Sequence, residues 1–74
     1  MICQGITNKT YDADGVRHVA ADLLASTAPA TMPTTGENID GLEETDVLEA
    51  GSTLFVVNTA TAYMMNEEHE FKEL

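Results

Sequence analysis

The last third of the chain, residues 51–74, has the clearest pattern of hydrophobic and polar positions. Residues 53–58 form a run of β-branched and aromatic residues, and residues 62–66 form a second apolar run after a three-residue break. Two such runs separated by a short loop are typical of a β-hairpin. Residues 66–69 indicate a second turn, and residues 70–74 a short third strand. The pattern therefore predicts a small antiparallel β-meander at the C-terminus.

Both faces of the two longer strands in this meander are apolar. Side chains alternate along a strand, so each strand presents two pairs on opposite faces. These pairs are Leu54 with Val56 against Phe55 with Val57 in the first strand, and Tyr63 with Met65 against Ala62 with Met64 in the second. A sheet of this kind is covered on both sides, and one short helix covers only one of them. We expect a neighbouring subunit to cover the second face.

Residues 16–25 carry a different spacing, in which apolar positions return every three or four residues. This period is that of an amphipathic helix. Asp14 is placed to cap such a helix, and Pro29 follows its expected end. The apolar positions that carry the spacing are Val16, Val19, Ala20, Leu23 and Leu24. We therefore predict one short helix over residues 16–25, and a fold of the α+β class that is mostly β.

Residues 1–15 are expected to form a short strand at a sheet edge, or an arm that reaches a neighbour. Ile2 and Ile6 are the apolar points of this segment. It ends at residues 12–15 in an Asp-Ala-Asp-Gly sequence, which is typical of a turn because Asp side chains bond nearby amides and glycine accepts positive φ. The glycine comes too early after the first Asp for a calcium loop, and the closing Glu is missing.

Residues 26–50 differ in kind from the rest of the chain. They contain both prolines and a cluster of acids, namely Glu37, Asp40, Glu43, Glu44, Asp46 and Glu49. The only apolar side chains able to anchor the segment are Met32, Ile39, Leu42, Val47 and Leu48. Such a composition is typical of a linker that does not order by itself. We predict an extended acidic loop that becomes ordered against another chain.

Length and cysteine content point to a single small domain with a partner. A chain of 74 residues buries only about 60% of the surface that its unfolded form exposes, so its core is small. Cys3 is the only cysteine, which excludes an intrachain disulfide. His18 and His69 are far apart and lack the spacing of metal ligands. We therefore expect no metal or other cofactor, and an oligomer or a subunit docked on a larger assembly.

Charge excludes two classes of partner. The net charge is -10, from thirteen acidic residues against Lys9, Arg17 and Lys72. Nucleic acids and anionic membranes are bound chiefly through Lys and Arg, so neither is an expected partner. No apolar run approaches the roughly 18 residues of a membrane span, and the first ten residues lack the pattern of a signal peptide. We expect a protein that is made and assembled in the cytoplasm.

No pattern of catalytic residues is present. The sequence has no Ser/His/Asp or Cys/His arrangement that so short a chain would close, and no glycine-rich phosphate loop. The acid pairs at 43–44 and 67–68 fall in turn-like stretches, where nothing raises a carboxyl pKa for general acid catalysis. The sequence predicts a protein that is not an enzyme.

Two motifs near the C-terminus read Gly-Ser-Thr-Leu-Phe-Val-Val-Asn-Thr over residues 51–59 and Ala-Tyr-Met-Met-Asn-Glu over residues 62–67. They resemble the C-terminal segment of short virion-associated proteins of tailed phages and prophages, which closes with an aromatic strand. Residues 14–22 resemble the helical element that often precedes it, and residues 33–36 with the acidic loop resemble the connection. One departure is Phe71, which stands where a Trp is expected.

This resemblance implies a structural role in a phage particle, on the head surface, with no catalytic residues. We expect a protein of the virion that decorates or cements the capsid, with the major capsid protein or other virion proteins as partners and with further copies of itself. The contact is expected to use the meander strands and the apolar anchors of the loop. The predicted interface residues are Leu54, Phe55, Val56, Val57, Tyr63, Met65, Met32, Ile39, Leu42 and Leu48.

Two other functions remain open from the sequence. The first is a tail or fibre-linked module that recognises a host surface, for which Tyr11 or Tyr63 would provide the aromatic platform of a carbohydrate site. Few aromatic residues and no Trp make this a poor fit. The second is an acidic inhibitor of a basic host protein, which needs acids spaced along an ordered face rather than clustered in a loop.

Overall fold

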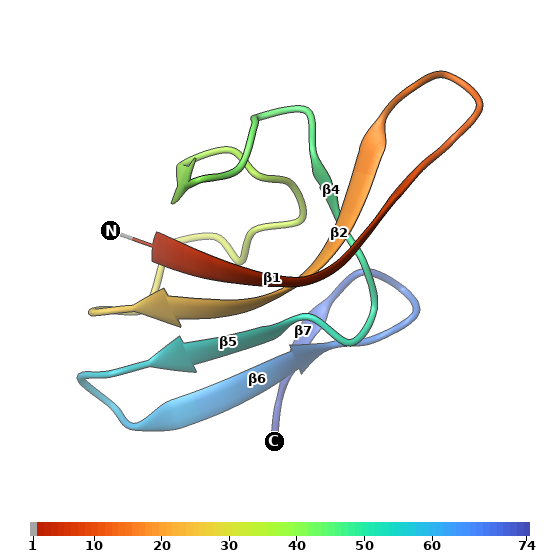
Figure 1. The fold of residues 1–74 in the computed structure, drawn as a ribbon. Coiled ribbons are helices and arrows are strands. Elements are labelled where there is room, and N and C mark those ends of the chain that lie inside the picture. Colours follow the sequence, from red (N-terminus) through yellow and green to blue (C-terminus); the bar gives the residue numbers. More distant parts are fainter. Residues whose placement is uncertain (1) are drawn as a thin grey trace.

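The computed structural model describes residues 2–74, so Met1 of the expected N-terminal strand or arm lies outside the described residues. The strands are β1 (Ile2–Tyr11), β2 (Arg17–Ala25), β3 (Ile39–Asp40), β4 (Val47–Leu48), β5 (Thr53–Val56), β6 (Thr61–Met65) and β7 (Phe71–Glu73). All of them belong to one mixed sheet (Figure 1). Within residues 2–74 there is no helix, and hence none long and apolar enough to cross a membrane.

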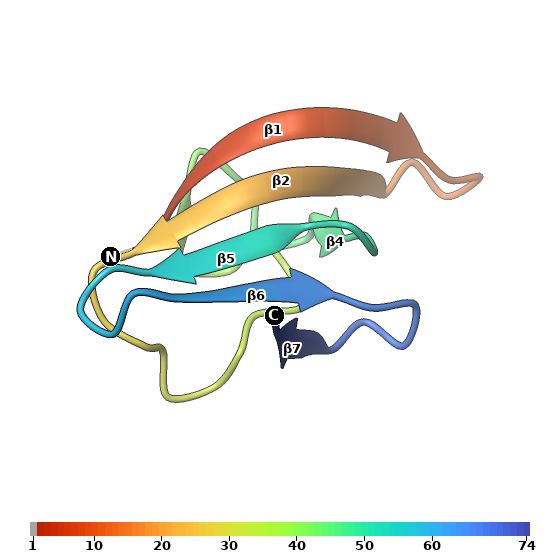
Figure 2. The same cartoon turned by 90° about the horizontal axis from the view of Figure 1, so that it is seen from below.

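The order of strands across the sheet is β3-β1-β2-β5-β6-β7, with β4 paired to β2 beside β5. The long strands β1, β2, β5 and β6 lie next to one another in Figure 2, and β7 turns away beyond β6. Pairing is antiparallel between β1 and β2 and through β5, β6 and β7, whereas β2 runs parallel to both β4 and β5. Strand β2 is thus the central strand, with neighbours along both of its edges.

The predicted helix over residues 16–25 is wrong, and with it the α+β class: the segment is strand β2 of an all-β fold. The buried positions alternate with a period of two, because Val19, Ala21, Leu23 and Ala25 face the core. Two of these are alanines, which contribute little to a hydrophobic pattern, while Leu24 is apolar yet exposed. The sequence therefore shows a false helical spacing. Asp14 accordingly caps no helix, and the motif at 14–22 forms a turn and a strand.

The turn at residues 12–15 is present and joins β1 to β2. One carboxylate oxygen of Asp12 accepts hydrogen bonds from the backbone N–H groups of Asp14 at 2.9 Å and Val16 at 3.0 Å. Gly15 has a φ of 81°, which few residues other than glycine adopt easily. These features close the hairpin that projects beyond the rest of the sheet in Figure 1. Strand β1 carries a bulge in this hairpin, where the register shifts between Ile6 and Asn8.

The three strands expected in residues 51–74 are present as β5, β6 and β7, in antiparallel order. Leu54 lies opposite Tyr63, and Met65 lies opposite Phe71. Leu54 and Met65 are fully buried, whereas Phe55 is exposed, as the alternation of the strand requires. The pattern of the sequence therefore predicted the strands in this part of the chain and which of their residues share a face.

One face of the sheet, which we call the inner face, forms the core. Its buried side chains come from the six strands β2 to β7: Val19, Ala21, Leu23, Ala25, Ile39, Leu48, Leu54, Val56, Met65 and Phe71. Ile2, Met32, Leu42 and Tyr63 pack at the margin of this cluster. The core therefore unites residues that are far apart in the sequence.

The prediction that residues 26–50 form an extended loop ordered by another chain is also wrong. The segment packs on the chain's own sheet and contributes β3 and β4. Ile39 and Leu48 are buried in the core, and Met32 and Leu42 pack against it. Its backbone groups also bond one another: the N–H of Leu48 donates to Thr34 O at 3.0 Å. Ile39 pairs with β1 and Leu48 pairs with β2. The composition of the segment alone does not reveal these contacts.

Gly36 shows how tightly this segment is folded. Its N–H donates to the carbonyl oxygen of Asp46 at 2.9 Å, so the chain doubles back on itself. A Cβ at this position would lie 2.2 Å from the carbonyl oxygen of Glu43. Only glycine fits so close to another backbone.

Candidate functional site

The side of the sheet opposite the core is covered by no other part of the described chain along β2, β5, β6 and β7. Strand register places its side chains in two rows that cross these four strands. One row is Asp22, Thr53, Met64 and Lys72, and the other is Leu24, Phe55, Ala62 and Leu74. Leu74 joins the second row because its N–H donates to Ala62 O at 2.9 Å. We call these eight residues, together with Val57, the outer face.

Large apolar side chains on the outer face are exposed. The exposed fraction is 50% for Leu24, 40% for Phe55, 52% for Val57 and 41% for Met64. Leu24 and Phe55 are direct cross-strand partners, and Ala62 adjoins Phe55 on the next strand. Scattered apolar residues are normal on a protein surface, whereas a contiguous exposed group is a candidate for an interaction site. The outer face is such a group.

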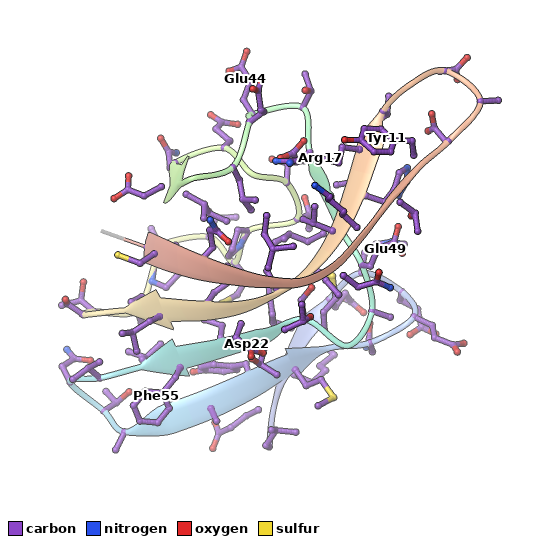
Figure 3. All side chains as sticks on the ribbon, viewed as in Figure 1. Tyr11, Arg17, Asp22, Glu44, Glu49 and Phe55 are labelled. Carbon is purple, nitrogen blue, oxygen red and sulfur yellow. The ribbon has the colours of Figure 1, made fainter. Side chains whose placement is uncertain are left out.

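Charge is almost absent from the outer face, although the protein carries a net charge of -10. Asp22 and Lys72 are the charged members of its two rows, and they sum to zero. The Asp22 carboxylate accepts a hydrogen bond from the Thr53 hydroxyl at 2.7 Å. In Figure 3, Asp22 and Phe55 lie over the β2, β5 and β6 strands, whereas Glu44 lies in the segment beyond β2. Most acids of the chain lie in loops and turns, and those in strands are Asp22, Asp40 and Glu73.

The structure separates the ten predicted interface residues into three groups. Leu54, Val56, Met65, Ile39 and Leu48 are buried in the chain's own core. Tyr63, Met32 and Leu42 are partly buried at the margin of that core. Phe55 and Val57 are exposed on the outer face, where a partner can reach them.

Two polar contacts tie residues 26–50 to strand β2. The first is between Arg17 on β2 and Asp46, which is 3% exposed. Arg17 donates to both carboxylate oxygens of Asp46, with a distance of 3.1 Å from Nε to Oδ1. The backbone N–H of Glu43 donates to the same carboxylate at 2.9 Å. Arg17, aided by this N–H, lowers the pKa of Asp46, so the pair stays charged at neutral pH.

The second contact is built around His18, the most chemically versatile side chain in the described part of the molecule. Its Nε2 lies 3.2 Å from Asp12 Oδ2, and its Nδ1 contacts Glu49 Oε1. The two carboxylates, that of Asp12 first, raise the pKa of His18. The Val16 backbone N–H, with His18, lowers the pKa of Asp12. Because both ring nitrogens are engaged, His18 joins the hairpin turn to the β4–β5 connection and has no nitrogen free to act as a base.

No group of three or more His, Cys, Asp or Glu side chains in residues 2–74 is arranged to hold a metal ion. Asp12 and Glu49 contact opposite nitrogens of the His18 ring, so these three groups do not converge on one point. Cys3 is exposed and is not part of a disulfide.

The sequence did not single out Asp22, Leu24, Met64 and Lys72 as members of one surface. The helix predicted over residues 16–25 separates Leu24 from Phe55. The alternation that puts Met64 on one face of an apolar strand is the usable signal in the sequence. Asp22 and Lys72 lie in the same row only because of the register between four strands. No local sequence pattern encodes this register.

Comparisons of this chain with protein-family models, with curated proteins and with solved structures each found no match.

Proposed function

We propose that this protein is a non-enzymatic structural protein of a phage particle, which decorates or cements the capsid through subunit contacts made by the outer face. The observation that carries this proposal is the outer face itself. It is apolar, nearly uncharged and uncovered, in a small molecule that is otherwise strongly acidic.

The chemistry of the outer face supports burial against protein. Interface cores are depleted of charged residues and enriched in aromatic residues and Met. The outer face has this composition, since it carries Phe55 and Met64. Phe55, Leu24 and Val57 each project from a strand of the sheet or its immediate end, so little conformational entropy is lost when a partner covers them. An apolar surface carried by paired strands suits a lasting contact in an assembly.

The resemblance of residues 51–59 and 62–67 to short virion proteins gives the proposal its biological setting. These residues form β5, β6 and the turns around them, which carry half of the outer face. The major capsid protein, or another virion protein, is the partner on this proposal, together with further copies of this chain. The protein then resides in the virion and is assembled in the host cytoplasm.

Quantitative mass spectrometry of purified particles tests the proposal. A decoration or cement protein is present in many copies per particle. A few copies that copurify with tails would instead indicate the host-recognition function. Complete absence from particles would indicate a protein that acts in the cell, such as the acidic inhibitor. Either of these last two results contradicts the proposal.

A pair of variants then links the function to the outer face. Val57→Asp introduces a charge at a position that is 52% exposed, so the domain still folds, but the charge is buried wherever a subunit covers this face. We expect its copy number per particle to fall by about tenfold or more. Thr59→Asp adds the same charge in the exposed β5–β6 turn and serves as the matched control. Normal incorporation of Val57→Asp would show that the outer face is not the contact.

A further inference from the structure

We propose that the outer face binds the outer face of a second copy of this chain, about a two-fold axis that runs along the strands between β5 and β6. This inference rests on the proposed function in that it names one partner of the same surface.

Charge explains how two acidic copies come together. Each copy has a net charge of -10, so most ways of bringing two copies into contact are repulsive. The outer face is the exception, because the Asp22 and Lys72 charges in its rows cancel. Acids such as Glu44 and Glu68 are exposed in loops and turns instead. Contact through the outer face therefore removes apolar surface from water while leaving like charges apart.

Register explains why the contact is symmetric. In the order β2-β5-β6-β7, an axis between β5 and β6 places β2 over the partner's β7 and β5 over the partner's β6. Asp22 and Lys72 are the two ends of one row, linked through Thr53 and Met64. The two-fold operation keeps the row and exchanges its ends. Asp22 then lies opposite the partner's Lys72, and Lys72 opposite the partner's Asp22.

The other row matches in size under the same operation. Phe55 on β5 lies over the partner's Ala62 on β6, so a large side chain meets a small one at both symmetric positions. Leu24 at one end of the row lies over the partner's Leu74 at the other end. Alternation of large and small residues across two facing sheets allows them to interdigitate. Packing of Phe55 against another Phe55 would instead hold the sheets apart.

The twist of the sheets is compatible with this pairing. Packed sheets lie about 10 Å apart, with their strands inclined by about 30°. Asp22 and Lys72 lie one and a half strand spacings from the axis, or about 7 Å, so this inclination shifts them by only about 4 Å along the strands. The Lys72 side chain is 66% exposed and its Nζ lies 4.0 Å from Glu70 Oε1, so it gives up only a weak exposed contact when its long side chain spans such an offset.

The experiment is sedimentation equilibrium of the full chain, with Cys3→Ser as the background so that no disulfide forms between copies. We expect a dimer that Asp22→Lys and Lys72→Asp each weaken about tenfold or more, because each change places like charges opposite one another twice. The double variant Asp22→Lys/Lys72→Asp restores opposite charges in reversed order. Its dissociation constant should return to within about threefold of the parent.

Matched controls separate this local effect from a change of net charge. Glu44→Lys and Lys9→Asp change the net charge by the same amounts as the two single variants, at exposed positions away from the outer face. Both should leave dimerisation within about threefold of the parent. Circular dichroism at a low concentration, where all of them are monomeric, should show that the five variants keep the folded spectrum of the parent. Weakening by the single variants without rescue in the double variant would overturn the proposed axis.

The outcomes also distinguish this inference from the proposed function. A chain that stays monomeric at about 100 μM, well above the micromolar range of an ordinary specific dimer, overturns the inference. If Val57→Asp is then still lost from particles, the outer face binds another virion protein and the proposed function stands. A dimer rescued by the charge exchange, in a chain that is absent from particles, supports the inference and contradicts the proposed function.

Discussion

The side-chain oxygen of Ser52, which is fully buried, accepts a hydrogen bond from the backbone N–H of Ala21 at 3.2 Å. This bond lies where β2 changes neighbours along one edge, from β4 at His18 and Val19 to β5 at Asp22 and beyond. Without Ser52, the N–H of Ala21 would be buried and unpaired at that gap. A single hydroxyl thus allows two short parallel strands to share one edge of the central strand.

Ser52→Ala should therefore destabilise the fold more than its small change in volume suggests. A buried donor without a partner costs about 1–3 kcal/mol. In a domain of this size each kcal/mol lowers the melting temperature by about 4–8 °C. Thermal melting followed by circular dichroism measures the effect, and Ser26→Ala, at an exposed position, is the control. Equal melting temperatures for the two variants would show that the Ser52 bond is not needed.

Neighbouring positions on β5 should differ sharply in their effect on stability. Leu54 is fully buried and Phe55 is 40% exposed. Leu54→Ala leaves a cavity in the core, which costs about 2–5 kcal/mol. Phe55→Ala in the monomer, at low protein concentration, should change stability by about 0.5 kcal/mol or less. Urea unfolding measures both, and a larger loss in Phe55→Ala would mean that the two faces of the sheet are assigned the wrong way round.

The contacts of His18 make stability depend on pH in the neutral range. Because the folded state raises the pKa of His18 above its ordinary value of 6.5, its contribution is fully present below that pH and is lost as the pH rises through the folded pKa. The melting temperature of His18→Gln should therefore lie below that of the parent at pH 5–6, with a gap that closes toward pH 9. His69→Asn, in the exposed β6–β7 turn, is the control. A gap that widens with rising pH would contradict this sign.

The Arg17–Asp46 pair predicts a second pH dependence, of opposite sign, in acid. Arg17 lowers the pKa of Asp46 below its ordinary value of 3.8, so the contribution of Asp46 is present above that pH and is lost as the pH falls through the folded pKa. Asp46→Asn should melt below the parent at neutral pH, and the gap should narrow as the pH falls below 3.8 and through the lowered pKa of Asp46. Glu44→Gln, which changes an exposed acid in the same segment, should melt like the parent throughout.

Strand pattern in the C-terminal part could be predicted from the sequence because the signal there is local. Thr53 to Val56 and Thr61 to Met65 are rich in β-branched and large apolar residues, and a short turn joins them. Such strands pair with their neighbours in sequence, so composition, turn and alternation all point to one arrangement. The turn at 12–15 was likewise predicted from its Asp and Gly residues.

Local signals of this kind could not predict that residues 17–25 form a strand. Ala21 and Ala25 occupy core positions but are too small to mark them, and Leu24 marks the wrong face. Alanine and leucine also favour a helix when no partner strands are present. Strand β2 forms because β1, β4 and β5 bond along its two edges, and two of those strands lie more than twenty residues away.

The sequence alone determined that this chain is small, acidic and without a disulfide, and that its C-terminal strands are apolar on both faces. Only the tertiary structure decided which face is the core, because that depends on where residues 26–50 lie. Ile39 and Leu48 reach the inner face through pairing with β1 and β2, and this leaves Leu24, Phe55 and Val57 uncovered on the other. The outer face is thus a product of long-range register, which brings Asp22 and Lys72 into one row although fifty residues separate them.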